Sequence, residues 1–191
     1  MKRIGNNRME EQALSDFCRQ GNNTARKELY DRYADRLFGL CLRYVSDRDT
    51  AYDIFQDGFL KIYQSFDKFV WRGDGSLRAW LERVMINEAL QYLRRNKNII
   101  DSGIPIEEIS DVYDIPNAEK VEHIPEKVLM KFIAELPEGY RTVFNLFAIE
   151  GKSHRQIAQI LGINEKSSAS QFYRAKVTLA KRINEWMKTN G

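Results

Sequence analysis

The charges of this chain are not spread evenly, and they divide it into three segments. Residues 1–98 carry 18 lysines and arginines against 14 acidic residues, and residues 127–191 carry 11 against five. Residues 99–126 carry one lysine against eight acidic residues, together with three of the four prolines. Because proline interrupts helices and like charges repel, this middle segment is predicted to be extended. The predicted organisation is two basic domains, 1–98 and 124–191, joined by a flexible acidic linker, 99–123.

The composition excludes several classes of protein. With 43% hydrophobic residues, the 191-residue chain can build cores, which excludes wholesale disorder. It has no run of the roughly 18 apolar residues that a membrane span needs and no apolar stretch of a signal peptide, so a cytoplasmic location is predicted. The two cysteines, Cys18 and Cys41, stand among apolar residues. They are predicted to be buried free thiols rather than a disulfide or a metal pair.

Apolar residues recur at helical spacing almost throughout, and no segment alternates with period two long enough to form a strand. In the first block, the apolar face of residues 37–45 marks one helix, for which Thr24 is a predicted N-cap. A second helix is expected to open at Asp49 or Thr50. A third is expected to run from about Ser76 to Arg95. The predicted fold class is therefore all-α.

The helix start and stop signals of the C-terminal block predict a helix-turn-helix. Pro137 lies in the first turn of a helix that is expected to end at Gly151. Residues 153–156 (SHRQ) fit a capping box that opens a short helix, which stops at Gly162, and Asn164 is the predicted cap of the last helix. Two helices joined by a glycine turn are typical of a helix-turn-helix, although an ordinary helical hairpin has the same pattern.

Three segments together resemble the extracytoplasmic-function sigma factors of bacterial RNA polymerase. Residues 51–63 (AYDIFQDGFLKIY) are similar to the core-binding helix of that family. Residues 71–81 (WRGDGSLRAWL), with 92–95 (YLRR), are similar to its promoter-melting loop and minus-ten helix. The stretch from Leu136 to 174–176 (RAK) is similar to its minus-thirty-five-reading domain. The segments follow one another in the order and spacing of the family.

The resemblance covers about residues 10–96 and 124–186 and implies both a fold and a function. It implies sigma domain 2, a helical bundle, and sigma domain 4, joined by a linker that such factors thread through the polymerase. The acidic linker could imitate nucleic acid there or serve as a solvated tether. The implied function is that of a transcription initiation factor, which binds core polymerase, directs it to specific promoters and promotes DNA melting.

The same resemblance implies the partners. They are the clamp of the largest polymerase subunit, the flap of the second-largest subunit and promoter DNA. Factors of this class are often held inactive by an anti-sigma protein, which makes such a protein a candidate partner.

Polar side chains gather on one side of the helix that starts near Asp53, opposite its aromatic face. A solvated helical face would look the same. The resemblance makes this side the surface that grips the polymerase clamp, where polar side chains set the register and Leu60 serves as an apolar anchor. The predicted core-binding residues are Asp53, Gln56, Asp57, Leu60 and Lys61.

Promoter melting requires a site that holds a base outside the duplex. Trp71, on the loop, is predicted to stack on one flipped base while Asn87 hydrogen-bonds its edge. Arg94 and Arg95 are expected to contact phosphates, and Trp80, at an inward helical position, is predicted to belong to the core. The predicted minus-ten and melting residues are Trp71, Arg72, Asp74, Arg83, Asn87, Gln91, Arg94 and Arg95.

In a helix-turn-helix, the first residues of the second helix reach base edges in the major groove. Glutamine can pair with adenine, and lysine or arginine with guanine. Ser168 departs from the commonest family pattern, which has an apolar residue there, and the basic residue that is usual at Ala169 and Gln171 is missing. The predicted minus-thirty-five residues are Arg155, Lys166, Ser167, Ser170, Gln171, Arg174 and Lys176, of which Arg155 and Lys176 are expected on phosphates.

The main alternative is a stand-alone helix-turn-helix regulator, which would bind promoter DNA without polymerase. An enzyme is not expected, because His123 and His154 are not spaced to cooperate with each other or with a cysteine. The sequence also shows no phosphate-cradling loop and no metal cluster. We therefore predict no catalytic residue, no metal site and no cofactor.

Overall fold

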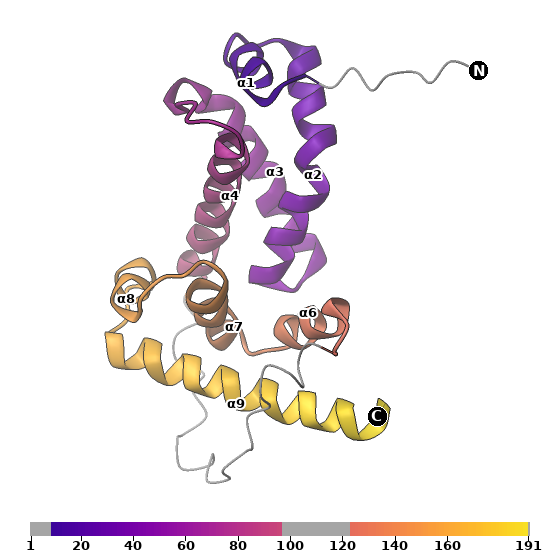
Figure 1. The fold of residues 1–191 in the computed structure, drawn as a ribbon. Helices are drawn as coiled ribbons and strands as arrows, with labels where there is room; N and C mark the ends of the chain where they lie inside the picture. Colours follow the sequence, from indigo (N-terminus) through magenta and orange to yellow (C-terminus); the bar gives the residue numbers. More distant parts are fainter. Residues whose placement is uncertain (1–8, 97–122, 191) are drawn as a thin grey trace, which may run out of the picture. The chain divides into compact units, whose positions relative to one another are not determined.

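The computed structural model describes residues 9–96 and 123–190 (Figure 1). Every regular element in these two ranges is a helix, so the predicted all-α class is confirmed. Contacts divide the chain into two compact units, one made mostly of the N-terminal helices and one mostly of the C-terminal helices. The predicted linker, 99–123, lies outside the described residues except for His123. Within the described ranges, we find no helix with the length and apolar character needed to span a membrane.

The first unit is a bundle of three long helices with a short helix at one end (Figure 1). Its helices are α1 (Glu11–Arg19), α2 (Asn23–Val45) as far as Cys41, α3 (Arg48–Gln64), the 3-10 turn η1 (Phe66–Lys68) and α4 (Ser76–Arg95) as far as Ala89. The predicted bounds of α4 are confirmed. The predicted cap Thr24 is wrong, because it lies inside α2 and the Asn22 carboxamide oxygen accepts the Ala25 N–H at 3.0 Å instead. Helix α1 is not among the predicted helices, and α3 begins one residue before Asp49.

Aromatic rings fill the space between α2 and α3. The Tyr30 ring lies 5.9 Å from that of Phe55 and 5.0 Å from that of Phe59. Helices α3 and α4 approach closely at Gly58, where an added Cβ would come within 2.4 Å of the Met85 Sδ atom. The bundle therefore has a tight inner face, and the remaining face of α3 points to solvent.

Both cysteines are free and buried, as predicted. Cys18 is 1% exposed and Cys41 is 0% exposed. Burial raises the pKa of the Cys18 thiol to about 11 and that of Cys41 to about 12. Both side chains are therefore protonated core residues at neutral pH.

The second unit consists of short helices packed along one long helix, α9 (Figure 1). Its elements are α6 (Glu126–Ala134), α7 (Glu138–Phe144), the π-helical turn η4 (Asn145–Ile149), α8 (His154–Leu161) and α9 (Glu165–Asn190). The capping box is confirmed, since the Gln156 N–H donates to the Ser153 hydroxyl and the Ser153 N–H donates to the Gln156 side chain. Gly162 has φ +70° at the end of α8, a conformation that glycine adopts without strain.

The last helix is capped as predicted, because the Asn164 Oδ1 accepts the Ser167 N–H at 2.7 Å. Its inward residues Ala175 and Leu179 form a core with Leu136 and Tyr140. The helix-turn-helix prediction is therefore confirmed as a fold, with α8 and α9 as its two helices. Helix α6 was not predicted, and α9 runs on to Asn190.

Candidate functional site

The polar side of α3 is exposed along its length. The carboxylates of Asp53 and Asp57 stand one turn apart at the surface, and Gln56 is half-buried between them. Leu60, one turn further, is 58% exposed, an unusual degree for a leucine. The structure thus brings the predicted core-binding residues onto one accessible helix face.

Two details of this face were not evident in the sequence. Lys61 is exposed, and its ammonium is paired with Glu88 of α4 at the surface of the bundle. Tyr52 is 53% exposed and stacks on Phe55, with ring centroids 6.3 Å apart. Its exposed ring extends the apolar part of the surface. In the sequence, the only sign of this exposure was the position of Tyr52 next to Asp53.

The loop between η1 and α4 is fixed at its first end by α1. The Arg19 guanidinium donates to the carbonyl oxygens of Phe66 and Phe69, at 3.3 and 2.9 Å. Both rings lie against Trp80, with centroid distances of 5.1 and 5.2 Å. Trp80 is half-buried and packs against two buried rings, so it lies at the edge of the core for which it was predicted. Val70, the next residue along the loop, is 64% exposed.

The other end of the loop is held by Glu11 of α1. One carboxylate oxygen accepts the Gly75 N–H at 2.9 Å, and the other accepts the Tyr33 hydroxyl at 2.6 Å. Burial, and next the hydrogen bond to Glu11, raise the pKa of Tyr33 to about 12, so this hydroxyl stays a donor. Gly75 has φ +81°, which suits glycine. The conformation of the loop is therefore fixed at both ends by residues of the same short helix, without DNA.

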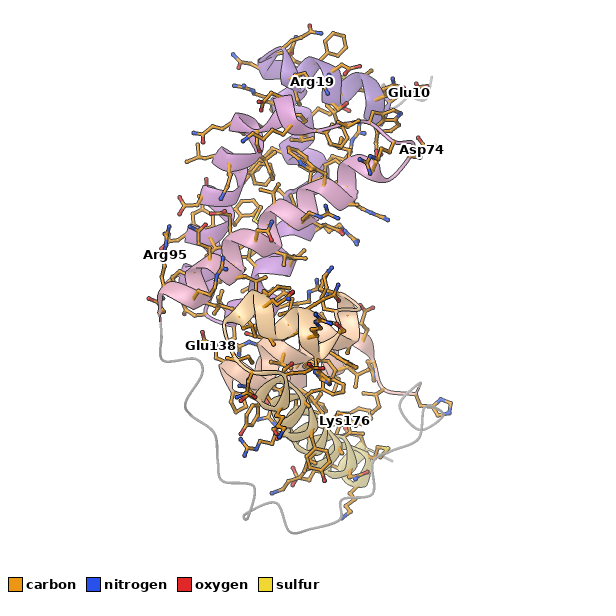
Figure 2. All side chains as sticks on the ribbon, turned by 90° about the vertical axis from the view of Figure 1, so that its left-hand side faces the viewer. Glu10, Arg19, Asp74, Arg95, Glu138 and Lys176 are labelled. Carbon is orange, nitrogen blue, oxygen red and sulfur yellow. The ribbon has the colours of Figure 1, made fainter. Side chains whose placement is uncertain are left out.

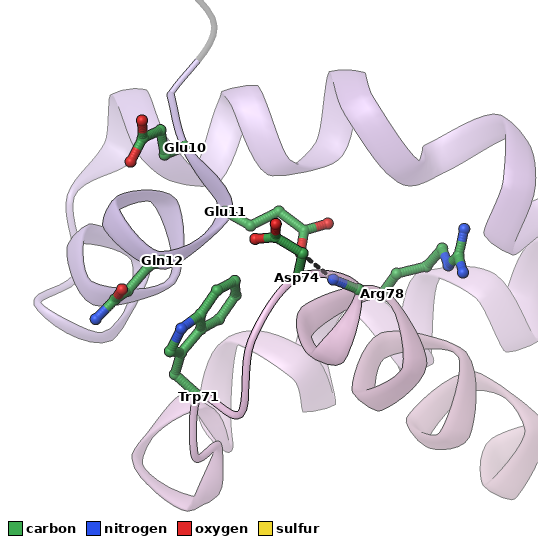
Figure 3. Close-up of a pocket in the computed structure, with 7 residues that line it drawn as sticks. Glu10, Glu11, Gln12, Trp71, Asp74 and Arg78 are labelled. Atoms are coloured by element: carbon green, nitrogen blue, oxygen red, sulfur yellow. Dashed lines mark hydrogen bonds between the residues drawn. The ribbon is translucent and has the colours of Figure 1, made fainter.

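A cavity of about 680 Å³ opens between this loop and α1 (Figure 3). The Trp71 ring points from the loop toward α1, and the Arg78 side chain points away from the ring along α4. Carboxylates thus outnumber cations around the indole. The lining residues are Glu10, Glu11, Gln12, Trp71, Asp74, Gly75 and Arg78. Of these only Trp71 and Asp74 were predicted as site residues, and the residues at the start of α1 were missed because that helix had not been recognised.

The structure does not bring Asn87 to Trp71, which corrects the expectation that both hold the same base. Asn87 lies eleven residues beyond Ser76 in α4, about 16 Å along the helix axis. Figure 2 shows Asp74 at the loop end of this helix and Arg95 at its other end. The sequence spacing was correct, but a straight helix carries the side chain away from the loop.

The remaining predicted residues of this region are mostly exposed. Arg72 stands on the loop, and along α4 an accessible polar stripe runs opposite the buried face. The exposed members are Arg83, Asn87, Arg94 and Arg95, and Gln91 is half-buried. Such a stripe can follow a nucleic-acid backbone, because it has one cation at Arg83, two at Arg94 and Arg95, and hydrogen-bonding amides between them.

In the helix-turn-helix, fewer residues at the start of α9 are accessible than predicted. Lys166 is exposed, Ser167 and Ser170 are partly exposed, and Arg155 is exposed on α8. Tyr173, which was not predicted, is 51% exposed on the same face as Ser170. Its position three residues after Ser170 was the available signal.

Gln171 is not on this surface. It is 8% exposed and lies on the inward face of α9 with Ser168 and Ala175, so the expectation that it reads a base edge is wrong. Lys176 is partly exposed, and its ammonium lies 5.4 Å from the centre of the Phe172 ring. Arg174 is also partly exposed, although its Nε atom is buried without a hydrogen-bond partner.

Replacing Glu11 with alanine is expected to lower the free energy of unfolding by about 1–3 kcal/mol. The change leaves the Gly75 N–H and the Tyr33 hydroxyl without their acceptor, and an unsatisfied buried donor costs about that much. Urea denaturation would measure the loss, and hydrogen exchange at Gly75 should become faster. The matched control is Glu10→Ala, at the exposed neighbouring residue. Equal stability of the two variants would show that the Glu11 contacts contribute nothing.

No group of three or more His, Cys, Asp or Glu residues is placed to hold a metal ion in ranges 9–96 and 123–190. The geometry is that of binding surfaces, namely an exposed polar helix face, an aromatic loop pocket and a helix-turn-helix.

Comparison with known proteins gives the same division. The Sigma-70 region 2 model matches residues 29–99, and the Sigma-70, region 4 model matches residues 126–179. The ECF RNA polymerase sigma-E factor of Haemophilus influenzae is 31% identical over 192 residues, covering 94% of this chain and 98% of that protein. The RNA polymerase sigma-H factor of Pseudomonas aeruginosa is 28% identical over 184 residues, covering 91% and 94%. Among solved structures, the sigma factor RpoE of Bartonella quintana, in complex with the anti-sigma factor NepR, matches with a TM-score of 0.46 and 24% identity, covering 83% of this chain and 96% of that chain.

Proposed function

Because the chain belongs to the extracytoplasmic-function sigma factors of bacterial RNA polymerase, we propose that three of its surfaces divide the work of transcription initiation. As a member of this family it is a transcription initiation factor, which directs RNA polymerase to promoters. The proposed surfaces are the α3 face for core polymerase, the loop pocket for promoter melting and the helix-turn-helix for the minus-thirty-five element. The proposed domain boundaries are 1–98 and 124–191, with a linker over 99–123.

The α3 face is proposed to dock on the clamp of the largest polymerase subunit. Asp53 and Asp57 would pair with cations of the clamp, and the exposed Leu60 would fill an apolar recess between them. Exposed charges set register and association rate, and a desolvated apolar side chain adds affinity. Lys61 would contribute less, because Glu88 already neutralises it.

The loop pocket is proposed to hold one unstacked base of the minus-ten element. The Trp71 ring offers a stacking surface, and base stacking on an aromatic side chain stabilises by about 1–3 kcal/mol. Glu10 and Asp74, both exposed, offer carboxylate oxygens that accept hydrogen bonds from exocyclic amines of bases. The same carboxylates repel phosphate, so the pocket suits a base and not the backbone. Arg83, Arg94 and Arg95 would bind the phosphates that flank it.

The helix-turn-helix is proposed to read the minus-thirty-five element with the outward face of α9. Lys166 and Ser170 would reach base edges, and Arg155 of α8 would bind phosphate. Tyr173 adds an exposed aromatic ring to this face. Gln171 has no part in the proposed contacts.

The loop that Glu11 and Arg19 hold in place is the observation that supports this function over that of a plain DNA-binding regulator. A protein that only binds duplex DNA does not need an open aromatic pocket on a fixed loop, whereas a protein that melts DNA does. The alternative, a stand-alone regulator, would use the helix-turn-helix alone.

Run-off transcription with core polymerase, over a library of promoters from the host genome, tests the proposal. We expect specific transcripts from a subset of promoters only when the protein is added to core. Gel shifts supply the second arm: the protein alone should bind these promoters weakly, and the protein with core should bind them strongly. Strong binding to promoters without core, and no promoter-specific transcript with it, would favour the stand-alone regulator.

The proposal extends to the location of the protein, its lack of catalytic activity and its partners. We propose that the protein acts in the cytoplasm, beside the polymerase and the chromosome, and that it is not an enzyme and needs no cofactor, since the polymerase forms the bonds. The proposed partners are the polymerase clamp, the flap of the second-largest subunit and promoter DNA. An anti-sigma protein stays a prediction from the family.

A further inference from the structure

A partly buried hydrogen bond joins the two helices of the helix-turn-helix at their N-terminal ends. Ser168, in the first turn of α9, is 0% exposed. Its hydroxyl lies 3.0 Å from the Nδ1 atom of His154, the first residue of α8. A buried hydroxyl without a partner would destabilise the fold, so the serine is tolerated there because the imidazole meets it.

The imidazole of His154 is itself held in place by aromatic rings. It stacks on the Phe147 ring, with centroids 4.4 Å apart and planes 18° apart. Phe147 also lies 4.3 Å from the Phe172 ring of α9, and His154 lies 5.8 Å from the same ring. The π-helical turn η4 supplies Phe147, so three elements meet at one histidine.

A hydrogen bond defines direction in a way that an apolar contact does not. The hydrophobic effect has no preferred direction, whereas a hydrogen bond weakens steeply when its angle or distance changes. The serine hydroxyl can rotate to donate or to accept, so the pair persists with either tautomer of the imidazole. The stacked imidazole therefore gives the first turn of α9 one preferred orientation relative to α8.

We propose that the His154–Ser168 pair is a positioning element for promoter reading, which orients the outward side chains of α9 without touching DNA. The proposal rests on the proposed role of the helix-turn-helix at the minus-thirty-five element. Lys166 and Ser170 flank Ser168 in the sequence and point outward, so a small rotation of this turn moves both away from the base edges. The pair thereby contributes to sequence selectivity and not only to stability.

The test measures two quantities for the full chain, one in the assembly with core polymerase and one on the free protein. The first is selectivity, the ratio of affinities for a promoter found by run-off transcription and for the same promoter with a scrambled minus-thirty-five element. The second is the melting temperature of the free protein. Ser168→Ala and His154→Ala should each lower the selectivity ratio about threefold to tenfold, the effect of one hydrogen bond on an equilibrium. Both variants should also melt at a lower temperature.

The double variant His154→Phe with Ser168→Ala separates positioning from stability. It replaces both partners with apolar groups and keeps a ring to stack on Phe147, so its melting temperature should return close to that of the wild type. Its selectivity should stay low, because the directional bond is gone. Recovery of both quantities would overturn the proposal and leave the pair as packing alone.

Two controls complete the design. Thr178→Ala removes another hydroxyl of α9, one that donates only along its own helix to the Arg174 carbonyl at 2.9 Å, and it should leave selectivity unchanged. Lys166→Ala should lower selectivity without lowering the melting temperature. A wild-type holoenzyme that does not discriminate between the two promoters would overturn the proposed function of this domain and the inference with it. Discrimination by the wild type that persists in Ser168→Ala would overturn the inference alone.

Discussion

Reversing two charges on α3, with Asp53→Lys and Asp57→Lys together, is expected to weaken binding to core polymerase by about 2 kcal/mol or more, about thirtyfold. Both carboxylates are exposed on one helix face, where reversal replaces attraction to a clamp cation with repulsion. The fold should be unaffected, because neither side chain takes part in the core of the bundle. A titration of labelled protein with core polymerase gives the affinity, and circular dichroism reports the helix content.

The matched control is the pair Asp31→Lys and Asp35→Lys on α2. These residues have the same spacing as Asp53 and Asp57 and are likewise exposed. Asp31 pairs with Lys27 at the surface, a contact that contributes little to stability. Core affinity should be nearly unchanged in this control. If both double variants lose affinity equally, the effect is one of net charge, and the α3 face is not the docking surface.

Replacing Trp71 with alanine is expected to shift the closed-to-open promoter equilibrium by about one to two powers of ten toward the closed state. In the proposed site, the indole would supply stacking energy of about 1–3 kcal/mol to the flipped base, comparable to the cost of unstacking it. Core binding should survive, because the α3 face is separate from the loop. Permanganate footprinting of the start region reports open complexes through the reactivity of unpaired thymines.

A template already melted across the start region should restore transcription by the Trp71→Ala variant, because the lost step is then bypassed. Val70→Ala serves as the matched control, since Val70 is the adjacent loop residue and is 64% exposed. Asn87→Ala should act independently of Trp71→Ala, since the two residues do not share a pocket. Normal thymine reactivity in the Trp71→Ala variant would show that the loop is only structural.

The helices that were predicted correctly are those with local signals. The bounds of α4, the capping box at Ser153 and the cap at Asn164 each depend on residues within one or two turns, which the sequence displays directly. Helices α1 and α6 are nine residues each and lack a side-chain N-cap hydrogen bond. Tertiary contacts, such as those of Arg19 and Glu11, stabilise α1, and no single-sequence pattern reports them.

The same distinction applies to the proposed functional surfaces: local patterns were predicted, and contacts between distant residues were not. The exposed face of α3 followed from helical periodicity alone. The position of Glu11 at the Trp71 cavity did not follow from periodicity, because Glu11 lies in a helix about 60 residues earlier in the chain. Gln171 was misplaced because glutamine is usually exposed, whereas here the inward face of α9 carries two polar residues, Ser168 and Gln171.

The two hydrogen bonds of the Glu11 carboxylate make the loop proposed for melting a discontinuous unit. A loop exchange between relatives that moves residues 71–75 alone would leave Gly75 facing whatever residue the recipient has at the start of its first helix. The exchange would carry over the sequence of the loop and not its shape. For this protein, the smallest portable module for the proposed base capture comprises the loop together with Arg19, Glu11 and the second partner of Glu11, Tyr33.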